Sequence, residues 1–276
     1  MVQHLEVVGA IGAPPVWPAL RNEAEHLATR EPTLASLLNS VVLRHHSLAA
    51  ALSFQLARKL GDQELRAMSL REICDEALAG DPSLIGLVEA DLRAVFERDP
   101  ACKGYVQPFL FFKGFLALQS HRVAHWLWVQ GREALAFYFQ SRASELFDVD
   151  IHPAASIGAG AFFDHGAGIV IGETARVGED VSIMQGVTLG GTSTDRVDRH
   201  PKVGKGVLIG AGALVIGNIH IGDFSKIGSG SVVTKPVPSG CTAVGVPARL
   251  VNCPTCSEPS KTMDQTLFDV DSDYVI

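Results

Sequence analysis

The chain has 276 residues, 47% of them hydrophobic, and a formal net charge of −7 at pH 7. This composition is ample for a buried core, and the negative charge argues against a general nucleic-acid-binding protein, whose phosphate contacts require a basic face. The N-terminus shows no secretion signal, and no apolar run is long enough to cross a bilayer. We therefore expect a cytoplasmic protein without a nucleic-acid or membrane partner.

The first half of the chain has the apolar spacing of amphipathic helices. Leu and Ala recur at intervals of three and four residues, and Asp-Pro pairs at 81–82 and 99–100 mark interruptions. We expect residues 1–149 to form a helical domain, in which residues 1 to about 15 are loose. The predicted helices are 17–30, 33–48, 53–60, 63–79, from Asp81 to about Arg98, 108–130 and 132–147.

From Ile151 to about Val233 an apolar residue recurs every six positions. Neither a helix nor an ordinary strand has this period, whereas a β-solenoid built from six-residue units stacks such residues into one apolar column. Only Ala175 weakens the pattern. The recurring residues are Ile151, Ile157, Phe163, Ile169, Val181, Val187, Val203, Ile209, Val215, Ile221, Ile227 and Val233. We expect residues 150–250 to form this domain.

One break interrupts the period, between Val187 and Val203, where two units and four extra residues fit. Within the break, residues 192–199 are polar and charged, so we expect them to project as a loop. The prolines at 236, 238 and 247 are expected to end regular structure. The acidic segment 251–276 is predicted to be a flexible tail.

Five cysteines are scattered along the chain, and this odd number favours reduced thiols over a disulfide framework. Cys253 and Cys256 form a CxxC pair without a second pair, which is only weak support for a zinc site. The remaining cysteines are Cys74, Cys102 and Cys241.

His165 is the candidate general base of the solenoid. It follows Asp164, next to the inward position of Phe163, and a carboxylate within reach can hold a histidine in one tautomer near neutral pH. Asp150 is the candidate partner, because its separation from His165 in the sequence is close to one turn of about 18 residues, which would stack the two on neighbouring coils. The alternative is a surface histidine at a corner.

Three further side chains are candidates for binding a charged substrate. Arg199 and His200 close the projecting loop, where the guanidinium could bind a carboxylate in a bidentate manner. Asp99 could accept from an ammonium group, although its spacing alone favours a plain helix cap. His152, His165 and His200 together leave a catalytic zinc site open as an alternative, although no two are close in sequence.

With these residues laid out, the chain resembles the serine O-acetyltransferases of the hexapeptide-repeat acyltransferase superfamily over nearly its full length. The generic repeat indicates the superfamily alone, and the helical half narrows the resemblance to the serine enzymes. The strings that carry it are Arg98-Asp99-Pro100-Ala101, 149–155, Phe163-Asp164-His165, 168–175, 187–192 and 198–202.

The resemblance implies an α+β chain, with an N-terminal helical bundle followed by a C-terminal left-handed parallel β-helix of hexapeptide repeats. It implies homotrimers, or dimers of trimers, with the active site between neighbouring solenoids. His165 would be the general base and Asp150 its orienting partner. The amino group of serine would bind Asp99 and Asp164, and its carboxylate would bind Arg199 and His200.

The resemblance also implies acetyl-CoA as co-substrate, with no tightly bound cofactor or metal. The residues expected to line its groove are Ala211, Lys226, Gly228 and Ser229. L-cysteine, which differs from L-serine only in its sulfur, is expected to inhibit. The apolar C-terminal Ile276 is expected to bind O-acetylserine sulfhydrylase, the next enzyme of cysteine synthesis. The competing hypotheses are acetyl transfer to another acceptor, a zinc lyase on the same solenoid, and a non-catalytic scaffold.

Overall fold

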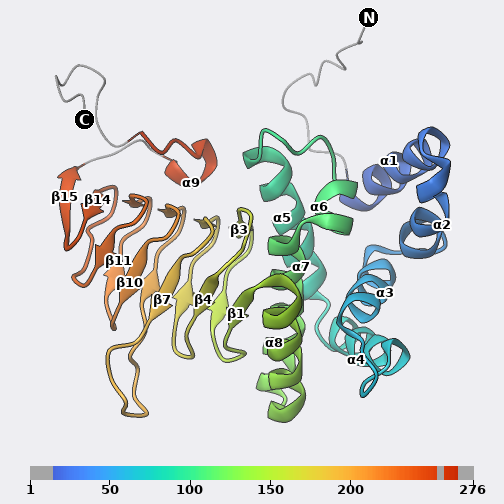
Figure 1. Cartoon of the computed structure of the whole chain (residues 1–276), viewed down its shortest axis with the longest axis horizontal. Helices are drawn as coiled ribbons and strands as arrows, with labels where there is room; N and C mark the ends of the chain where they lie inside the picture. The colour runs from blue at the N-terminus through green and yellow to red at the C-terminus, as the bar shows by residue number, and fades with distance from the viewer. Residues whose placement is uncertain (1–14, 254–257, 267–276) are drawn as a thin grey trace, which may run out of the picture.

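The computed structural model describes residues 15–253 and 258–266 and shows helices packed against one end of a β-solenoid (Figure 1). The helical half contains α1 (Val16–Arg30), a 3₁₀ turn (Pro32–Leu34), α2 (Ala35–Leu38), a π-helical turn (Asn39–Leu43), α3 (Leu48–Leu60), α4 (Ala67–Gly80), α5 (Ser83–Arg98), α6 (Val106–Phe111), α7 (Lys113–Val129) and α8 (Glu133–Phe147).

The predictions for α1, α5 and α8 are confirmed, but two predicted helices are divided in the structure. The segment 33–48 consists of short turns that stop before Ser47, whose hydroxyl accepts from Ala50 N (3.2 Å) and caps α3. The segment 108–130 is interrupted at Phe112, which has extended backbone angles. Apolar spacing alone did not reveal either break, because it continues across both.

The solenoid is formed by short strands in three sheets, one for each face of the coil, and their pairings are parallel except for that of β14 with β15. The first sheet contains β1 (Val149–Ile151), β4 (Ile169–Ile171), β7 (Thr188–Gly190), β10 (Leu214–Ile216) and β13 (Val232–Val233). The second contains β2 (Ser156–Ile157), β5 (Arg176–Val177), β8 (Lys202–Val203) and β11 (His220–Ile221). The third contains β3 (Phe162–Phe163), β6 (Ser182–Ile183), β9 (Leu208–Ile209), β12 (Lys226–Ile227), β14 (Thr242–Gly245) and β15 (Ala248–Asn252).

The strand register corrects the expected repeat. Ile151 pairs with Ile171, not with Ile169, so two extra residues lie in the corner between β3 and β4. Beyond this corner the stacked residues are Ile171, Val177, Ile183 and Leu189. Ala175 belongs to a second set of inward positions, two residues earlier, and is also buried. The chain therefore has two breaks in its period, and the first of them contains His165.

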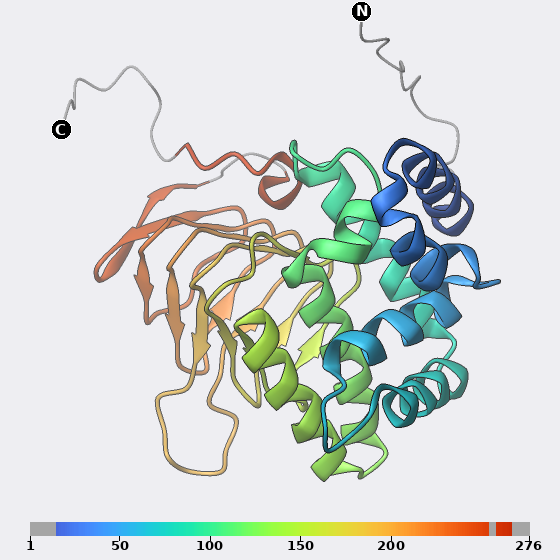
Figure 2. The ribbon, with the colours of Figure 1, turned by 45° about the vertical axis from the view of Figure 1, so that its right-hand side comes forward.

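The second break is the predicted loop. Val177 pairs with Val203, whereas Leu208 pairs with Lys226, so the coil that contains the break is longer than the ordinary coil that follows it. The extra residues are accommodated between β7 and β8. Figures 1 and 2 show this segment projecting away from the coils, as expected from its polar sequence.

The C-terminal region is more ordered than expected. Despite its prolines, β14 continues the stack beside β12 and forms an antiparallel hairpin with β15. This pairing brings the Cα atoms of Cys241 and Cys253 to 4.4 Å, where they form a disulfide, so the expectation of reduced thiols is wrong for this pair. Cys74 and Cys102 are buried free thiols, and Cys256 lies outside the described residues.

Part of the predicted flexible tail also packs on the solenoid. Residues 258–266 include the short helix α9 (Pro259–Thr262), which contacts α5. Ser182 Oγ donates to Ser260 O (2.8 Å), and Lys226 Nζ donates to Thr266 O (2.6 Å). Residues 267–276, including Ile276, lie outside the described part of the chain.

One apolar core runs from the helices into the solenoid. A buried ion pair lies at this junction, where Arg122 of α7 binds both carboxylate oxygens of Asp91 in α5 (2.7 and 2.9 Å). Arg122 also donates to the carbonyls of Ile157 and Gly158, and Asp91 accepts from Ala161 N. The first coil is thus tied to two helices. Among the described helices, none is long and apolar enough to cross a membrane.

Candidate active site

A pocket of about 560 Å³ lies where the helices meet the first coil. It contains Asp99, which follows α5, and Asp164 and His165, which follow β3. The structure therefore brings together three of the predicted site residues, two of which are distant from Asp99 in the sequence. Its other lining residues are Pro100, Ala101, 111–114 and Phe162 to Phe163.

Gly114 allows the helices to approach β3 closely enough to form this pocket. A Cβ atom at this position would lie 2.1 Å from the carbonyl oxygen of Phe163. Any side chain would therefore push the start of α7 away from the strand that leads to Asp164 and His165. The absence of a side chain at Gly114 therefore lets the helical wall of the pocket pack directly against the β3 wall.

His165 is presented to solvent rather than packed inside the coil. Its φ of 55° is left-handed, in the corner that contains the two extra residues, and its side chain is 74% exposed. Its Nε2 lies 3.8 Å from Asp164 Oδ1. Burial raises the pKa of the Asp164 carboxyl, the nearby His165 lowers it, and the charge of Asp99 raises it further. Two carboxylates and an imidazole thus share one pocket.

Asp150 lies one coil below the His165 corner, but not in the predicted alignment. Asp150 pairs with Val170, while the corner itself rests on residues 148–149 through the bond from Gly168 N to Asp148 O (2.7 Å). The coil is longer here than the turn of about 18 residues expected from the sequence, so Asp150 and His165 do not stack as predicted. Asp150 Oδ1 accepts a hydrogen bond from Gln140 Nε2 of α8 (2.6 Å).

Arg199 and His200 occupy a different corner, between β7 and β8. Arg199 Nη2 donates to Glu173 Oε2 (2.6 Å), which holds the pKa of Glu173 below its usual value. His200 is buried against Gly172, where a Cβ atom would lie 2.0 Å from its Nε2. Burial lowers the pKa of His200, as does the charge of Arg199.

The hydroxyl of Thr174 organises this second corner. Thr174 Oγ1 accepts from the backbone N–H groups of Arg199 (3.0 Å) and His200 (3.1 Å), and lies 2.9 Å from His200 Nδ1. Thr174 N also donates to Nδ1 (3.2 Å), which leaves the proton of the neutral ring on Nε2. Sequence reasoning missed Glu173 and Thr174 as site residues. The register that pairs β5 with β8 places Glu173 and Thr174 directly beside Arg199 and His200 on the next coil, and this stacking could have identified them.

The residues predicted to line a CoA groove lie on the same edge of the solenoid as His165. Ala211 and Ser229 occupy equivalent corners of successive coils, and Gly230 N donates to Ala211 O (2.8 Å). Lys226 is buried, and Gly228 N donates to Ala243 O (2.9 Å). The segment 264–266 runs along this edge and contacts both Lys226 and Ser229.

The three histidines of the zinc alternative do not converge. His165 lies in the first pocket, His200 is held by Thr174, and His152 packs edge-on against Trp128 and Phe137. Within residues 15–253 and 258–266, no three side chains of His, Cys, Asp or Glu are grouped to hold a metal ion.

The fold and these residues match known families. Residues 16–120 match the model described as serine acetyltransferase, N-terminal, and residues 200–235 match the bacterial transferase hexapeptide model of six repeats. Helices joined to a solenoid of six-residue units therefore define a transferase of the hexapeptide-repeat class.

The relatives narrow this class to one family. The serine acetyltransferase of Haemophilus influenzae is 51% identical over 256 residues, which cover 93% of this chain and 96% of the relative. The crystal structure of serine acetyltransferase from Vibrio cholerae superposes with a TM-score of 0.90 at 52% identity, covering 91% of this chain and 98% of that one. This chain belongs to the serine acetyltransferase family, and the resemblance drawn from its sequence is confirmed.

Matching structures also include ligand complexes of serine acetyltransferases. One, from Neisseria gonorrhoeae, is a complex with serine (50% identity, TM-score 0.84, covering 86% of this chain and 97% of that one). Two others are complexes with cysteine (51%, 0.90, 92% and 98%) and with CoA (54%, 0.82, 86% and 98%).

Proposed function

We propose that this protein transfers the acetyl group of acetyl-CoA to the hydroxyl of L-serine, giving O-acetyl-L-serine for cysteine synthesis. The observation that carries the proposal is the pocket that places Asp99, Asp164 and His165 together. Two carboxylates that face one pocket repel each other, and a ligand ammonium group would relieve that repulsion. An amino acid with a nucleophilic hydroxyl supplies both the cation and the reacting atom.

His165 acts as the general base in this reaction. A serine hydroxyl is too weak a nucleophile until its proton is removed, so the imidazole takes that proton as Oγ attacks the thioester carbonyl. The resulting tetrahedral intermediate collapses by breaking the C–S bond. The imidazolium then returns its proton to the departing thiolate, which leaves CoA and O-acetylserine. Asp150 orients His165 in this proposal, with Gln140 holding the carboxylate through its other oxygen.

The serine carboxylate is bound by Arg199 and His200 of a neighbouring solenoid. In one chain these residues lie in a corner between the first and second sheets, whereas His165 lies between the third and the first. Assembly of three solenoids side by side would bring unlike corners together, and this argues for a homotrimer, or for trimers paired through their helices. Glu173 neutralises Arg199 until a substrate carboxylate competes for it.

Acetyl-CoA is used as a co-substrate along the edge of Ala211, Lys226, Gly228 and Ser229, with no tightly bound cofactor. The CoA complex of a related enzyme supports this use. The cysteine complex of another supports feedback inhibition. L-cysteine presents the same ammonium and carboxylate groups as L-serine, so we expect inhibition that is competitive with serine and weakened in Arg199→Ala.

Thiol release from acetyl-CoA on addition of L-serine tests the proposal. The purified protein should release CoA thiol with L-serine and should not do so with a sugar acceptor that lacks an ammonium and a carboxylate group. Release with the sugar alone would favour a different acceptor, and no release with any acceptor would favour a non-catalytic scaffold.

A further inference from the structure

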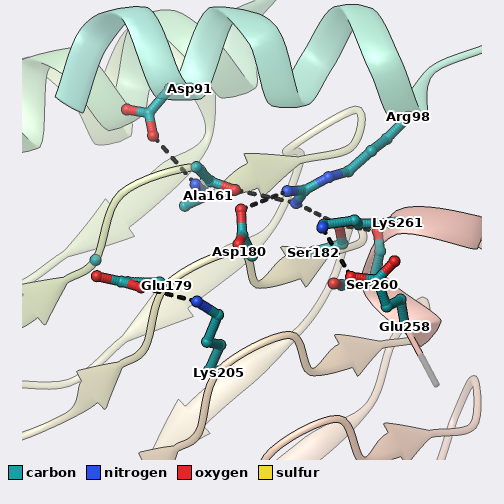
Figure 3. A network of polar contacts seen from close by, with 12 residues as sticks. Asp91, Arg98, Ala161, Glu179, Asp180, Ser182, Lys205, Glu258, Ser260 and Lys261 are labelled. Carbon is teal, nitrogen blue, oxygen red and sulfur yellow. Dashed lines mark hydrogen bonds and ion pairs between the residues drawn. The ribbon is translucent and has the colours of Figure 1, made fainter. Parts of the chain in front are cut away.

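Arg98 is the last residue of α5, directly before Asp99, and its side chain is only 2% exposed. Figure 3 shows its guanidinium reaching from the helix into the solenoid. Nη1 donates to Gly160 O (3.0 Å) and to Ser182 Oγ (3.2 Å), and Nη2 donates to Asp180 Oδ1 (3.0 Å). One side chain thus ties the end of the helix to two successive coils.

These contacts lie close to the pocket on both of its sides. On the helical side, Asp99 is the next residue and already lines the pocket. On the solenoid side, Gly160 is two residues before β3, which leads directly to Asp164 and His165. Arg98 therefore connects the two walls that carry the site residues. An arginine that only stabilises the fold would not need to contact the segments next to Asp99 and next to β3.

The hydrogen bonds of Asp99 itself are local: its N–H donates to Val95 O (3.0 Å), and its carbonyl accepts from Cys102 N (3.0 Å). The chain leaves the helix at this residue, and the Asp99 carboxylate accepts from Ala101 N (2.8 Å) within its own turn. The charge of Asp99 also acts unfavourably on Asp164, whose carboxyl pKa it raises. Two carboxylates that repel each other stay at a fixed separation only if other contacts anchor the segments that carry them.

We propose that Arg98 is a positioning residue, which holds Asp99 opposite Asp164 and His165 so that the pair can receive the ammonium group of the acceptor. The role rests on the proposed function. It assigns Arg98 no contact with substrate: the guanidinium acts by fixing the end of α5 to the coil that carries the base.

Arg98→Lys tests this role, because lysine keeps the charge but cannot make the forked contacts to Gly160, Ser182 and Asp180. The KM for L-serine should rise about tenfold, since small displacements of binding groups are costly, while the KM for acetyl-CoA should change less than twofold. In an Asp99→Asn background, Arg98→Lys should have no further effect on the KM for serine. Asp180→Asn, which weakens the contact between Arg98 and the second coil, should also raise the KM for serine.

Arg122→Lys is the matched control. Arg122 is also buried, and it also ties a helix to carbonyls of the first coil. Neither arginine lines the pocket, but Arg98 is next to Asp99 in the sequence, whereas Arg122 is not adjacent to any pocket residue. It should lower the melting temperature while leaving the ratio of the two KM values within twofold of the wild type. If Arg98→Lys fails to fold, Asp180→Asn carries the test, because its side chain is 31% exposed.

Two results overturn the role of Arg98 alone. One is a wild type active on serine whose Arg98→Lys and Asp180→Asn variants keep the serine KM. The other is an effect of Arg98→Lys that is undiminished in the Asp99→Asn background. A wild type with no activity on serine overturns the proposed function, and the role of Arg98 with it.

Discussion

The two corners that carry the predicted substrate residues are built in opposite ways. The His165 corner is open: the imidazole is 74% exposed, and its wall is completed by Asp99 from a distant helix. The Arg199 and His200 corner is closed: in the preceding coil Thr174 binds both residues, and Glu173 binds Arg199. The first corner therefore depends on docking of the helices, while the second is set by two neighbouring coils. In the proposed function, the open corner supplies the base and the ammonium site, and the closed corner supplies the carboxylate site.

The largest expected effect is at the open corner. His165→Ala removes the base, so kcat should fall by about 10²- to 10⁴-fold, while assembly is unchanged because the side chain is mainly exposed. Asp150→Asn should cause a smaller loss, since it only affects orientation. Thiol release measures both variants. His220→Ala, an exposed histidine on β11, is the control and should retain normal kcat. Near-normal release by His165→Ala would contradict this mechanism.

The next largest effect is expected at the closed corner. Thr174→Val removes the hydroxyl that binds the backbone of Arg199 and His200, at nearly constant volume. Loss of these two bonds should raise the KM for L-serine by up to about thirtyfold, because each is worth about 1 kcal/mol, while kcat changes less. Steady-state kinetics with Thr188→Val of β7 as control tests this. A fall in kcat with an unchanged KM would show that the corner participates in chemistry.

The sequence alone predicted the class of each half of the fold but not its alignment. The six-residue period identified the solenoid, because side chains that point inward must recur with the coil. The two extra residues near His165 were hidden, since Ile169 and Ile171 are both apolar and either could continue the pattern. The disulfide was missed for a related reason: residues 241 and 253 meet only because a hairpin forms after a proline-rich segment.

The residue patterns named Asp99, Asp164 and His165 as separate candidates, and only the family resemblance grouped Asp99 with Asp164. Asp99 alone indicated a helix cap, and it does accept from Ala101 N as a local turn residue would. Its position beside Asp164 depends on the close approach of α7 to β3 at Gly114 and on the contacts of Arg98 with two coils, which no local pattern records. Thr174 was missed because a threonine in a solenoid is ordinary, and its role appears only once the looped coil brings Arg199 and His200 back beside it.

The closed corner should also open at acidic pH. His200 has a lowered pKa, so its contribution to stability is fully present above its ordinary value of 6.5 and is lost as the pH falls through the lower value in the folded state. Protonation of Nδ1 would place a proton against the N–H and hydroxyl of Thr174. Amide exchange of Thr174, corrected for its intrinsic rate, should accelerate by at most about tenfold per pH unit below that point. His200→Asn should abolish this dependence, and a pH-independent exchange in the wild type would contradict it.

The smallest effect on acetylation is expected from deletion of Ile276, which lies outside the described residues. We propose that this apolar residue and its terminal carboxylate bind O-acetylserine sulfhydrylase, because backbone N–H groups at a helix N-terminus readily capture such a carboxylate while the side chain fills an apolar pocket. Removing it should change kcat and both KM values by less than about twofold, since His165, Asp99, Thr174 and Arg199 are all retained.

Binding of the deletion variant to the sulfhydrylase should nevertheless be lost in calorimetry. Asp269→Asn, which alters the charge of the same segment but keeps the terminus, is the control and should still bind. Undiminished affinity without Ile276 would exclude the terminus as the anchor. A loss of acetylation in the deletion variant would mean instead that Ile276 contributes to one of the two corners.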